Sequence, residues 1–333
     1  MEGYIHRFAP LWGEWTPVDV LGQGSFGTVW LVRRQDGAEG AVKEVVIPFH
    51  QDTLRSARWE GLTEEGARVY FRRLLTETEA EIELMRSLCG CETVVRFRKS
   101  QVQALTGQGE FGWVIHILMD RLVPFSARWA DTCTVRDAAQ MAVDIAKALE
   151  ACQEATIVHR DIKPDNLFYD PRSGRYQLGD FGIAHYLERP TEGKGRAGTL
   201  THMMPEVYQG APYTCGADLY ALGMILYRLL NDNRIPLLPP FPEDFGPRER
   251  DRATVQRLRG AAIHAPAILG YAATEGSLYH GYSAAFREED RYLALALGRI
   301  AAQAIAARPE ERFPSARDFR TAVETALHQC PAR

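Results

Sequence analysis

The sequence predicts an α+β fold with two lobes, a small lobe of strands with one long helix and a larger, mostly helical lobe. Short β-branched and aromatic runs, separated by turn residues, occupy much of residues 16–119. One long helical pattern interrupts them at 64–88, and helical periodicity dominates from residue 135 onward. A polar loop at 157–169 lies in the second lobe and carries the residues best suited to chemistry.

The composition is that of an ordinary globular protein. Of the 333 residues 46% are hydrophobic and 25% charged, and the net charge of −4 gives no reason to expect nucleic acid as a partner. No run of 18 apolar residues is present, and the segment 1–7 lacks the apolar stretch of a secretory signal, so we expect no membrane segment. A receptor cut before its membrane anchor would have the same pattern.

The six cysteines are scattered except for Cys89 and Cys91. A C-x-C pair without a second pair is poor spacing for zinc. Reduced thiols are usual in the cytosol, so the cysteine pattern favours a cytoplasmic location.

The N-terminal strands surround a glycine-rich turn. Strands are predicted at 16–21, 28–32 and 40–46, with Gly22, Gly24 and Gly27 between the first two. Dinucleotide-binding folds share this G-x-G-x-x-G spacing, but there the glycines open a helix. Here a β-forming run follows, which predicts a hairpin tip whose backbone N–H groups can approach phosphate oxygens. The alternative is a hairpin turn with no such role.

The strand at 40–46 places Ala41 and Lys43 on the same face, because side chains alternate along a strand. A lysine between valines is usually an exposed edge residue, and that interpretation stays open.

The long helix predicted at 64–88 has one apolar stripe. Glu81 borders that stripe, and a carboxylate at the edge of a buried face needs a cation, for which Lys43 is the candidate. Glu77, one turn earlier, is the rival, and both glutamates could face solvent. The stripe consists of Leu74, Thr78, Ile82, Met85 and Leu88.

Strands at 94–97 and 112–119 complete the small sheet, and a helix at 135–151 delivers the polar loop. In this loop Asp161 can accept a proton and Lys163 can hold negative charge. Asn166 offers a carbonyl oxygen to a hard cation.

A hairpin follows the polar loop. Turn residues at 170–174 precede a return strand at 175–178. Folding the chain about this turn places Gly179 or Asp180 opposite Asn166. An amide and a carboxylate side by side are suitable ligands for Mg²⁺.

At these residues the chain resembles the protein kinases. His159-Arg160-Asp161 with Asn166 is similar to their catalytic loop, and Asp180-Phe181-Gly182 to their metal-binding triplet. The segment 218–236 looks like the bacterial serine/threonine members of that family. The resemblance covers about residues 14–325 and implies a kinase N-lobe at 1–119, a hinge at 120–123 and a C-lobe at 124–333.

The resemblance implies a role for each polar residue. Asp161 would orient and deprotonate a substrate hydroxyl, and Lys163 would stabilise the phosphoryl group in transfer. Lys43, paired with Glu81, would fix the α- and β-phosphates of ATP. The implied ligands of Mg²⁺ (or Mn²⁺) are Asn166 and Asp180. The implied ATP-binding residues are Leu21, Gly22, Gly24, Gly27, Val29, Ala41, Lys43, Met119, Asp120, Leu122 and Phe168.

Three further residues are implied as structural supports of the C-lobe. Glu206 and Arg312 would form a buried ion pair, and Asp218 would brace the catalytic loop from below. The family usually has Tyr where His202 stands and Ala where Met204 stands. These departures affect the wall that receives the residue next to the phosphorylated one.

A phosphorylation site is also expected. Arg160 directly precedes Asp161, an arrangement that in this family usually accompanies control by activation-loop phosphorylation. Thr191 is the candidate, since a phosphate is a strong acceptor for a guanidinium. In the alternative interpretation, Glu188 or Glu192 already supplies the negative charge.

The sequence therefore predicts an enzyme that transfers phosphate from ATP to Ser or Thr hydroxyls of protein substrates, and of a second copy of itself in a homodimer. Lys163, two residues after Asp161, is the serine/threonine pattern. A pseudokinase scaffold is the first alternative, although Lys43, Asp161 and Asp180 are all present. A small-molecule phosphotransferase is the second, but such enzymes generally lack the Pro205-Glu206 segment.

Overall fold

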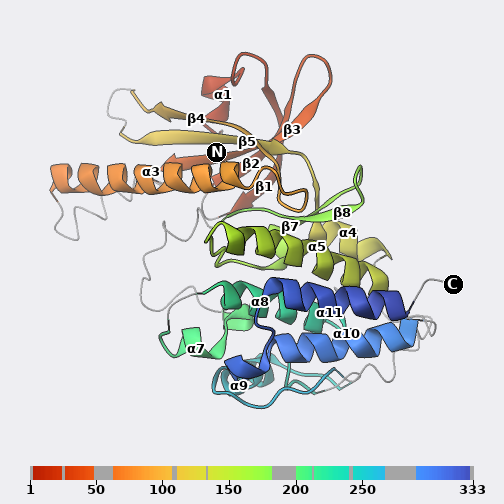
Figure 1. Cartoon of the computed structure of the whole chain (residues 1–333). Coiled ribbons are helices and arrows are strands. Elements are labelled where there is room, and N and C mark those ends of the chain that lie inside the picture. The colour runs from red at the N-terminus through yellow and green to blue at the C-terminus, as the bar shows by residue number, and fades with distance from the viewer. Residues whose placement is uncertain are drawn as a thin grey trace. The chain divides into compact units, whose positions relative to one another are not determined.

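The computed structural model describes residues 3–24, 27–48, 63–106, 111–132, 134–181, 200–211, 214–239, 243–266 and 290–330 (Figure 1). The chain divides into two compact units, with the first running to Leu122 and the second beginning at Val123. The first unit holds a five-stranded sheet and the second is mostly helical, as the predicted two-lobed α+β fold requires. No helix within the described ranges is both long and apolar enough to cross a membrane.

The sheet of the first unit is antiparallel throughout, with strand order β1-β2-β3-β5-β4. Its strands are β1 (Thr16–Gly24), β2 (Gly27–Arg33), β3 (Glu39–Ile47), β4 (Phe97–Ala104) and β5 (Trp113–Asp120). Gly24 pairs with Gly27 across the tip of the predicted hairpin. The predicted strand at 94–97 was wrong in its start, because Val94 and Val95 are buried outside the sheet and the strand begins only at Phe97.

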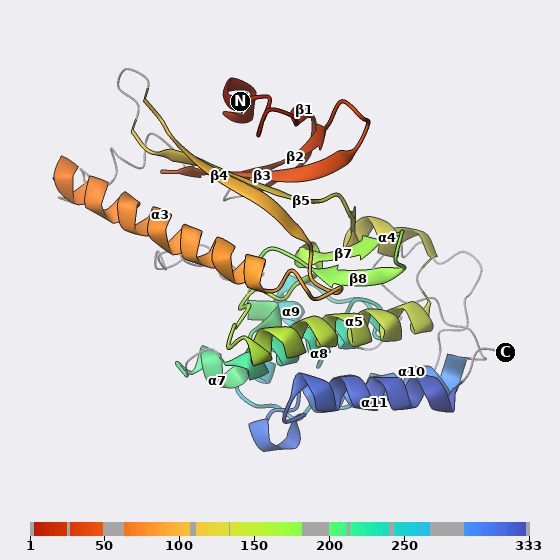
Figure 2. The same cartoon turned by 45° about the horizontal axis from the view of Figure 1, so that its top comes forward.

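Helix α3 (Glu64–Ser87) matches the predicted long helix. Its N-terminus is capped by Thr63, whose hydroxyl accepts the N–H of Gly66 at 3.0 Å. The helix lies along one face of the sheet (Figure 2). The predicted stripe is buried, as expected, at Leu74, Thr78, Ile82, Met85 and Leu88.

The opposite face of the sheet is covered by the first residues of the chain, which the sequence analysis did not foresee. Helix α1 (Ile5–Phe8) lies on the side of the sheet away from α3 (Figure 2). The segment forms an apolar cluster with side chains of β2, β3 and β5. Its buried members are Ile5, Leu11, Trp15, Trp30, Val32, Val42 and Leu118.

The second unit is built around α8 (Cys215–Leu229), which is buried along almost its whole length. Gly223 allows α10 (Arg291–Ala304) to approach closely, since a Cβ at that position would lie 2.6 Å from the Cβ of Ala304. The helices packed together in this unit are α5 (Val135–Glu154), α8, α10 and α11 (Ala316–Gln329). Shorter helices are α4 (Phe125–Thr132), α7 (Pro205–Tyr208) and α9 (Pro247–Leu258), with single 3-10 turns at Pro164–Asn166 and Pro309–Glu311.

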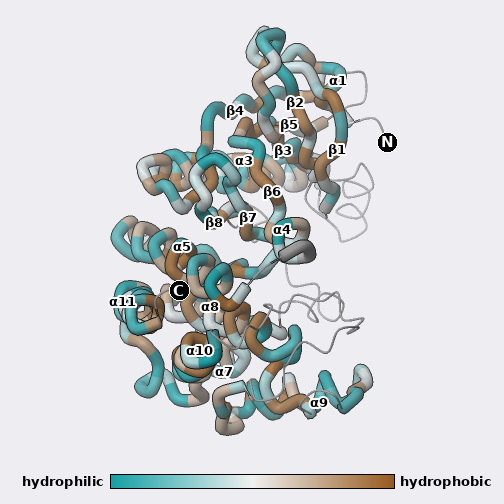
Figure 3. The backbone as a smooth tube through the Cα atoms, turned by 90° about the vertical axis from the view of Figure 1, so that its right-hand side faces the viewer, coloured by the Kyte–Doolittle hydropathy of each residue, from teal (hydrophilic) through white to brown (hydrophobic). Residues whose placement is uncertain are grey.

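A small sheet of β6 (Val123–Pro124), β7 (Leu167–Asp170) and β8 (Arg175–Leu178) lies against α5. The β7–β8 hairpin has the turn and the return strand that the sequence predicts. Colouring by hydropathy shows that α9 is mostly hydrophilic (Figure 3), although one of its arginines is buried.

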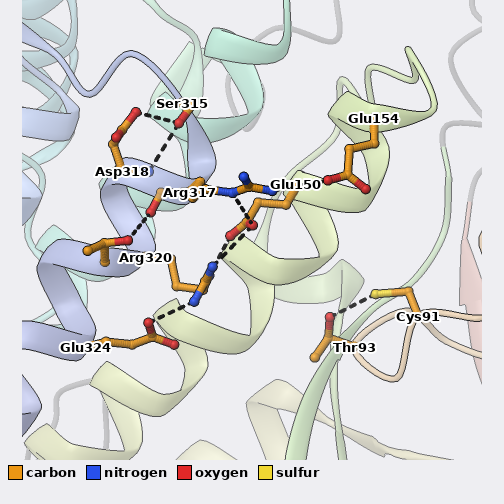
Figure 4. Close-up of polar contacts among 10 residues, drawn as sticks. Cys91, Thr93, Glu150, Glu154, Ser315, Arg317, Asp318, Arg320 and Glu324 are labelled. Atoms are coloured by element: carbon orange, nitrogen blue, oxygen red, sulfur yellow. Dashed lines mark hydrogen bonds and ion pairs between the residues drawn. The ribbon is translucent and has the colours of Figure 1, made fainter.

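Ion pairs join α5 to α11 at the surface (Figure 4). Glu150 of α5 accepts from Arg320 at 2.5 Å and from Arg317 at 3.3 Å, and Arg320 also contacts Glu324 at 2.8 Å. Arg317 is exposed and its pair with Glu150 contributes little stability, whereas Glu150 and Arg320 are partly buried.

Candidate active site

The polar loop is held from below by Asp218, in the first turn of α8. Its carboxylate accepts the backbone N–H of His159 at 2.7 Å and that of Arg160 at 2.8 Å. Burial raises the pKa of Asp218, while these two N–H groups oppose that rise. Arg160 has a φ of 67°, in the left-handed region, so the anchored loop also stores backbone strain.

Three of the predicted catalytic and metal residues meet in this loop. Lys163 Nζ lies 2.7 Å from Asp161 Oδ2. Asn166 donates from Nδ2 to the backbone oxygen of Asp161 at 2.7 Å and to its Oδ2 at 3.0 Å. The carboxylate of Asp161 is therefore fixed by an amide and an ammonium group.

The environment of Lys163 keeps its side chain charged. Burial alone lowers the pKa of the Lys163 ammonium, but its hydrogen bond to the Asp161 carboxylate and the charges of Asp161, Asp180 and Asp165 outweigh it, so that the pKa is raised above its usual value. A permanently charged ammonium group next to Asp161 is suited to holding an anionic group.

The β7–β8 hairpin brings the end of β8 back to the loop. The N–H of Gly179 donates to the backbone oxygen of Asn166 at 2.9 Å, which confirms the predicted pairing. His159 Nε2 lies 3.0 Å from the oxygen of Gly179 and fastens the loop to the same residue. Asp180, directly after Gly179, adopts a left-handed φ of 56°.

The donor set fits a hard divalent cation. Because both hydrogens of the Asn166 amide point at Asp161, its Oδ1 is the atom left to act as a ligand. Among the described residues, no hydrogen bond to that Oδ1 is present. Carboxylate and amide oxygens are the ligands that Mg²⁺ and Mn²⁺ prefer.

A groove of about 400 Å³ opens beside the loop within the second unit. The segment 201–204 and one face of α8 form much of its wall. His202 Nε2 lies 3.2 Å from Arg228 Nη1 in that wall. The residues that line the groove include Asp161, Lys163, Thr201, His202, Met204 and Arg228.

Glu206 and Arg312 lie together in the same unit. Arg312 Nη1 is 2.6 Å from Glu206 Oε1, and Nη2 is 3.0 Å from Oε2, which is a bidentate pair. The Arg312 side chain is buried, whereas that of Glu206 is 27% exposed. Arg312 Nη1 also lies 3.7 Å from the sulfur of the buried Met204, one of the two departures from the family pattern.

In the first unit, register brings the predicted nucleotide residues together. Val29 pairs with Lys43 on one side and with Gly22 on the other. Ala41 pairs with Met119. Lys43 is only 9% exposed and lies on β3, between β2 and β5, which excludes the edge-lysine interpretation.

The glycines of the hairpin differ in what the backbone requires of them. Gly27 has a φ of 146°, and a Cβ there would lie 1.9 Å from the backbone oxygen of Glu44. At Gly22 a Cβ would meet nothing within 4 Å. A side chain at position 27 would therefore clash with the backbone of β3, so glycine is required there. A side chain at position 22 would meet no such obstacle.

The predicted hinge residues are partly engaged by their own unit. The N–H of Asp120 donates to the oxygen of Arg96 at 3.2 Å, and its carboxylate pairs with Arg98. Leu122 is half-buried. Of the remaining predicted residues, Phe168 is half-buried on β7 in the second unit, opposite Gln177.

Two predictions lie outside the described residues. The side chain of Glu81 is one, so its pairing with Lys43 remains a prediction. Thr191 is the other, together with the loop around it.

Asp144 of α5, which was not predicted from the sequence, binds the β7–β8 hairpin to that helix. Its buried carboxylate accepts the N–H of Tyr176 at 3.0 Å and pairs with Arg175 at 3.2 Å. Burial raises the pKa of Asp144 against these contacts. A carboxylate on the apolar face of a predicted helix was the available clue, the same one that was used for Glu81.

Comparison with known proteins agrees with this geometry. Residues 15–254, more than half of the chain, match the family model of the protein kinase domain. The chain is 27% identical over 243 residues to the serine/threonine-protein kinase PkaA of Streptomyces coelicolor, which covers 70% of this chain and 40% of that protein.

Two other relatives carry the same kind of name. The serine/threonine-protein kinase Pkn1 of Myxococcus xanthus is 32% identical over 189 residues, or 55% of this chain and 23% of Pkn1. The serine/threonine-protein kinase nekl-2 of Caenorhabditis elegans is 25% identical over 222 residues, or 65% of this chain and 57% of nekl-2. The matched part is thus less than two thirds of each of these relatives. Protein kinase domains generally use ATP and a divalent metal, and by the match over residues 15–254 this chain belongs to the protein kinase domain family.

Proposed function

We propose that the protein transfers the γ-phosphoryl group of ATP to serine and threonine hydroxyls of protein substrates. The observation that carries the proposal is the fixed group of Asp161, Lys163 and Asn166 beside the groove. Phosphoryl transfer needs little covalent chemistry from a protein and depends mainly on positioning and charge. The serine/threonine kinase names of the relatives support the choice of acceptor.

Each residue of this group has a task that follows from its contacts. Asp161 Oδ2 is held by Lys163 and Asn166, so the carboxylate is oriented before a substrate arrives. It accepts the proton of the substrate hydroxyl. Lys163, kept charged by the surrounding carboxylates, holds the anionic group in transfer.

The metal would be Mg²⁺ or Mn²⁺, with Asn166 and Asp180 as its ligands. A bound divalent cation supplies neutralisation of phosphate charge during transfer. Lys43, buried on β3 opposite Val29, holds the α- and β-phosphates, with Glu81 as its proposed partner.

ATP would be bound by the residues that the resemblance to protein kinases implies. Those proposed are Leu21, Gly22, Gly24, Gly27, Val29, Ala41, Lys43, Met119, Asp120, Leu122 and Phe168.

No observation favours the pseudokinase alternative. Such proteins usually lose the lysine, the loop aspartate or the metal aspartate, and Lys43, Asp161 and Asp180 are all retained. The contacts of Asp161 with Lys163 and Asn166 support its proposed role as proton acceptor.

The test is phosphate transfer from labelled ATP by the purified protein to itself and to a generic basic protein. Asp161→Asn should lower kcat by roughly 10²–10⁴-fold, because proton transfer loses its acceptor. Asp180→Asn and a metal chelator should each abolish transfer. Asp251→Asn, which neutralises an exposed carboxylate on α9, is the control and should behave as wild type.

Label on tyrosine alone would contradict the assignment of the acceptor, and label that persists in Asp180→Asn would contradict the mechanism. Autophosphorylation between two copies would make the rate per molecule rise with protein concentration. Thr191 stays the proposed site of that modification, and a cytoplasmic location stays a prediction from the cysteine pattern.

A further inference from the structure

Helix α9 is largely hydrophilic, yet it buries one arginine completely. Arg257 is 1% exposed. Its Nη1 donates to the backbone oxygen of Met203 at 2.7 Å and to the hydroxyl of Tyr220 at 2.6 Å, and its Nη2 donates to the backbone oxygen of Leu200 at 2.6 Å. The guanidinium of Arg257 thus hydrogen-bonds to both ends of the segment 200–203.

Burying a charged guanidinium in a core carries a penalty in desolvation free energy. Within the described part of the chain, Arg257 has no ion pair with a carboxylate, and its Nε has no hydrogen-bond partner. Among the described residues, the partners of this charge are two carbonyl oxygens, the hydroxyl of Tyr220 and the ring of Tyr220, 5.6 Å away. Apolar residues of similar volume often replace buried ions without loss of stability, so stability alone does not explain an arginine here.

The segment 200–203 forms part of the wall of the substrate groove. Thr201, His202 and Met203 line the groove on the same side as Asp161 and Lys163. Arg257 itself is not among the lining residues, so it holds the wall from behind. Its contacts go to backbone oxygens, which fixes the path of the chain whatever side chains the segment carries.

A second arginine supports the next part of the same loop. Arg312 pairs with Glu206 and lies over the ring of Tyr220 at 4.9 Å. Arg312 therefore fixes the end of the loop at α7, and Arg257 fixes the stretch that faces the groove. The two arginines share Tyr220 as a common support.

We propose that Arg257 is a positioning residue for the polypeptide substrate. By fixing the backbone of 200–203, it sets the shape of the groove in which a substrate segment lies while its hydroxyl is presented to Asp161. This inference rests on the proposed function. The described contacts of Arg257 go to Leu200, Met203 and Tyr220, which are not among the proposed ATP-binding residues. Its loss should therefore weaken binding of the protein substrate and leave binding of ATP unchanged.

Arg257→Met and Arg257→Lys test this proposal in the full chain. Misplacement of a substrate by about an ångström can cost on the order of 10²-fold, so we expect KM for the protein substrate to rise roughly 10- to 100-fold in Arg257→Met. The KM for ATP should keep its wild-type value. Arg257→Lys retains the charge but cannot reach both carbonyls, so it should fall between Arg257→Met and wild type.

The matched control is Arg234→Met. Arg234 is also buried, donates to the backbone oxygens of Pro239 and Glu243 at 2.7 and 2.6 Å, and lies over the ring of Phe245 at 5.1 Å. It resembles Arg257 in its burial, its bonds to backbone oxygens and its aromatic neighbour, but it holds a different segment and also lies 3.7 Å from the carboxylate of Asp232. Arg234→Met should lower the Tm without raising KM for the protein substrate.

Two kinetic results would overturn the proposal: unchanged substrate KM in both Arg257 variants, or an equal rise in Arg234→Met. Hydrogen exchange gives a readout that does not depend on catalysis. Amides of 200–204 should exchange faster in Arg257→Lys than in wild type, while those of α8 should not. If the wild-type protein does not transfer phosphate, the proposed function is contradicted. If the amides of 200–204 exchange as slowly in Arg257→Lys as in wild type, the positioning role of Arg257 is contradicted.

Discussion

The loops 159–166 and 200–206 both depend on α8, but they are anchored by groups of opposite charge. The first turns two N–H groups toward Asp218, a buried anion. The second turns carbonyl oxygens and a carboxylate toward Arg257 and Arg312, which are buried cations. Where backbone N–H groups face inward, the buried partner is a carboxylate, and where carbonyl oxygens face inward, it is a guanidinium.

That contrast has an energetic side. Asp218 is satisfied by two short hydrogen bonds to N–H groups, although burial still raises its pKa. Arg312 has a carboxylate partner in Glu206, which is partly open to water. Removal of Asp218 or of Arg312 leaves different groups without a partner. Substitutions at these two residues, and at the further buried anion Asp144, measure the free energies involved.

The largest effect is expected for Asp218→Ala. Two buried N–H groups, those of His159 and Arg160, lose their acceptor, which costs about 1–3 kcal/mol each. The loop then shifts, and kcat should fall on the order of 10²-fold because Asp161 is displaced. Thermal unfolding and steady-state kinetics measure both changes. Near-normal kcat in a destabilised protein would mean that the bonds from Asn166 to Asp161 suffice to hold the loop.

A smaller effect is expected for Arg312→Ala. Breaking a buried ion pair by removing one partner costs roughly 3–5 kcal/mol, and water can reach Glu206, so we expect about 3 kcal/mol in the free energy of unfolding. Arg308→Ala is the control, because Arg308 pairs with Glu311 on the surface, and it should unfold like wild type. If both variants unfold like wild type, the Glu206–Arg312 pair does not stabilise the loop.

The smallest effect is a pH dependence at Asp144, another buried anion that accepts a backbone N–H. Burial raises its folded-state pKa above the ordinary value of 3.8, so the folded protein binds this proton more tightly than the unfolded chain. Wild type should therefore be most stable relative to Asp144→Asn below pH 3.8, and should lose that advantage as the pH rises through the folded-state pKa. Denaturant unfolding of both proteins across this range measures the difference, and a constant difference would contradict the raised pKa.

The two anchors also differ in how well sequence could predict them. Asp218 was predicted because it belongs to a motif with fixed offsets from its neighbours, and the Asn166–Gly179 pairing followed from the length of one turn. Arg257 was missed because nothing in the local pattern of α9 separates it from the exposed arginines around it. Its burial depends on where α9 meets the segment 200–203, 54 or more residues earlier in the chain.

The same reason explains the success with α3 and the failure at the N-terminus. Helical spacing alone determines which side chains of α3 share a face, so its buried stripe could be predicted. Residues 3–15 have no such periodicity, and their burial depends on an apolar sheet face that exists only after β2, β3 and β5 have paired.

That N-terminal cover has a practical consequence for producing the protein. The family match begins at residue 15, yet Ile5 and Leu11 are fully buried against the sheet. A shortened chain that begins at the family boundary would leave Trp30 and its apolar neighbours open to water. Large exposed apolar patches promote self-association. For recombinant work, the packing of residues 3–15, and not the family boundary, determines where the chain can be cut.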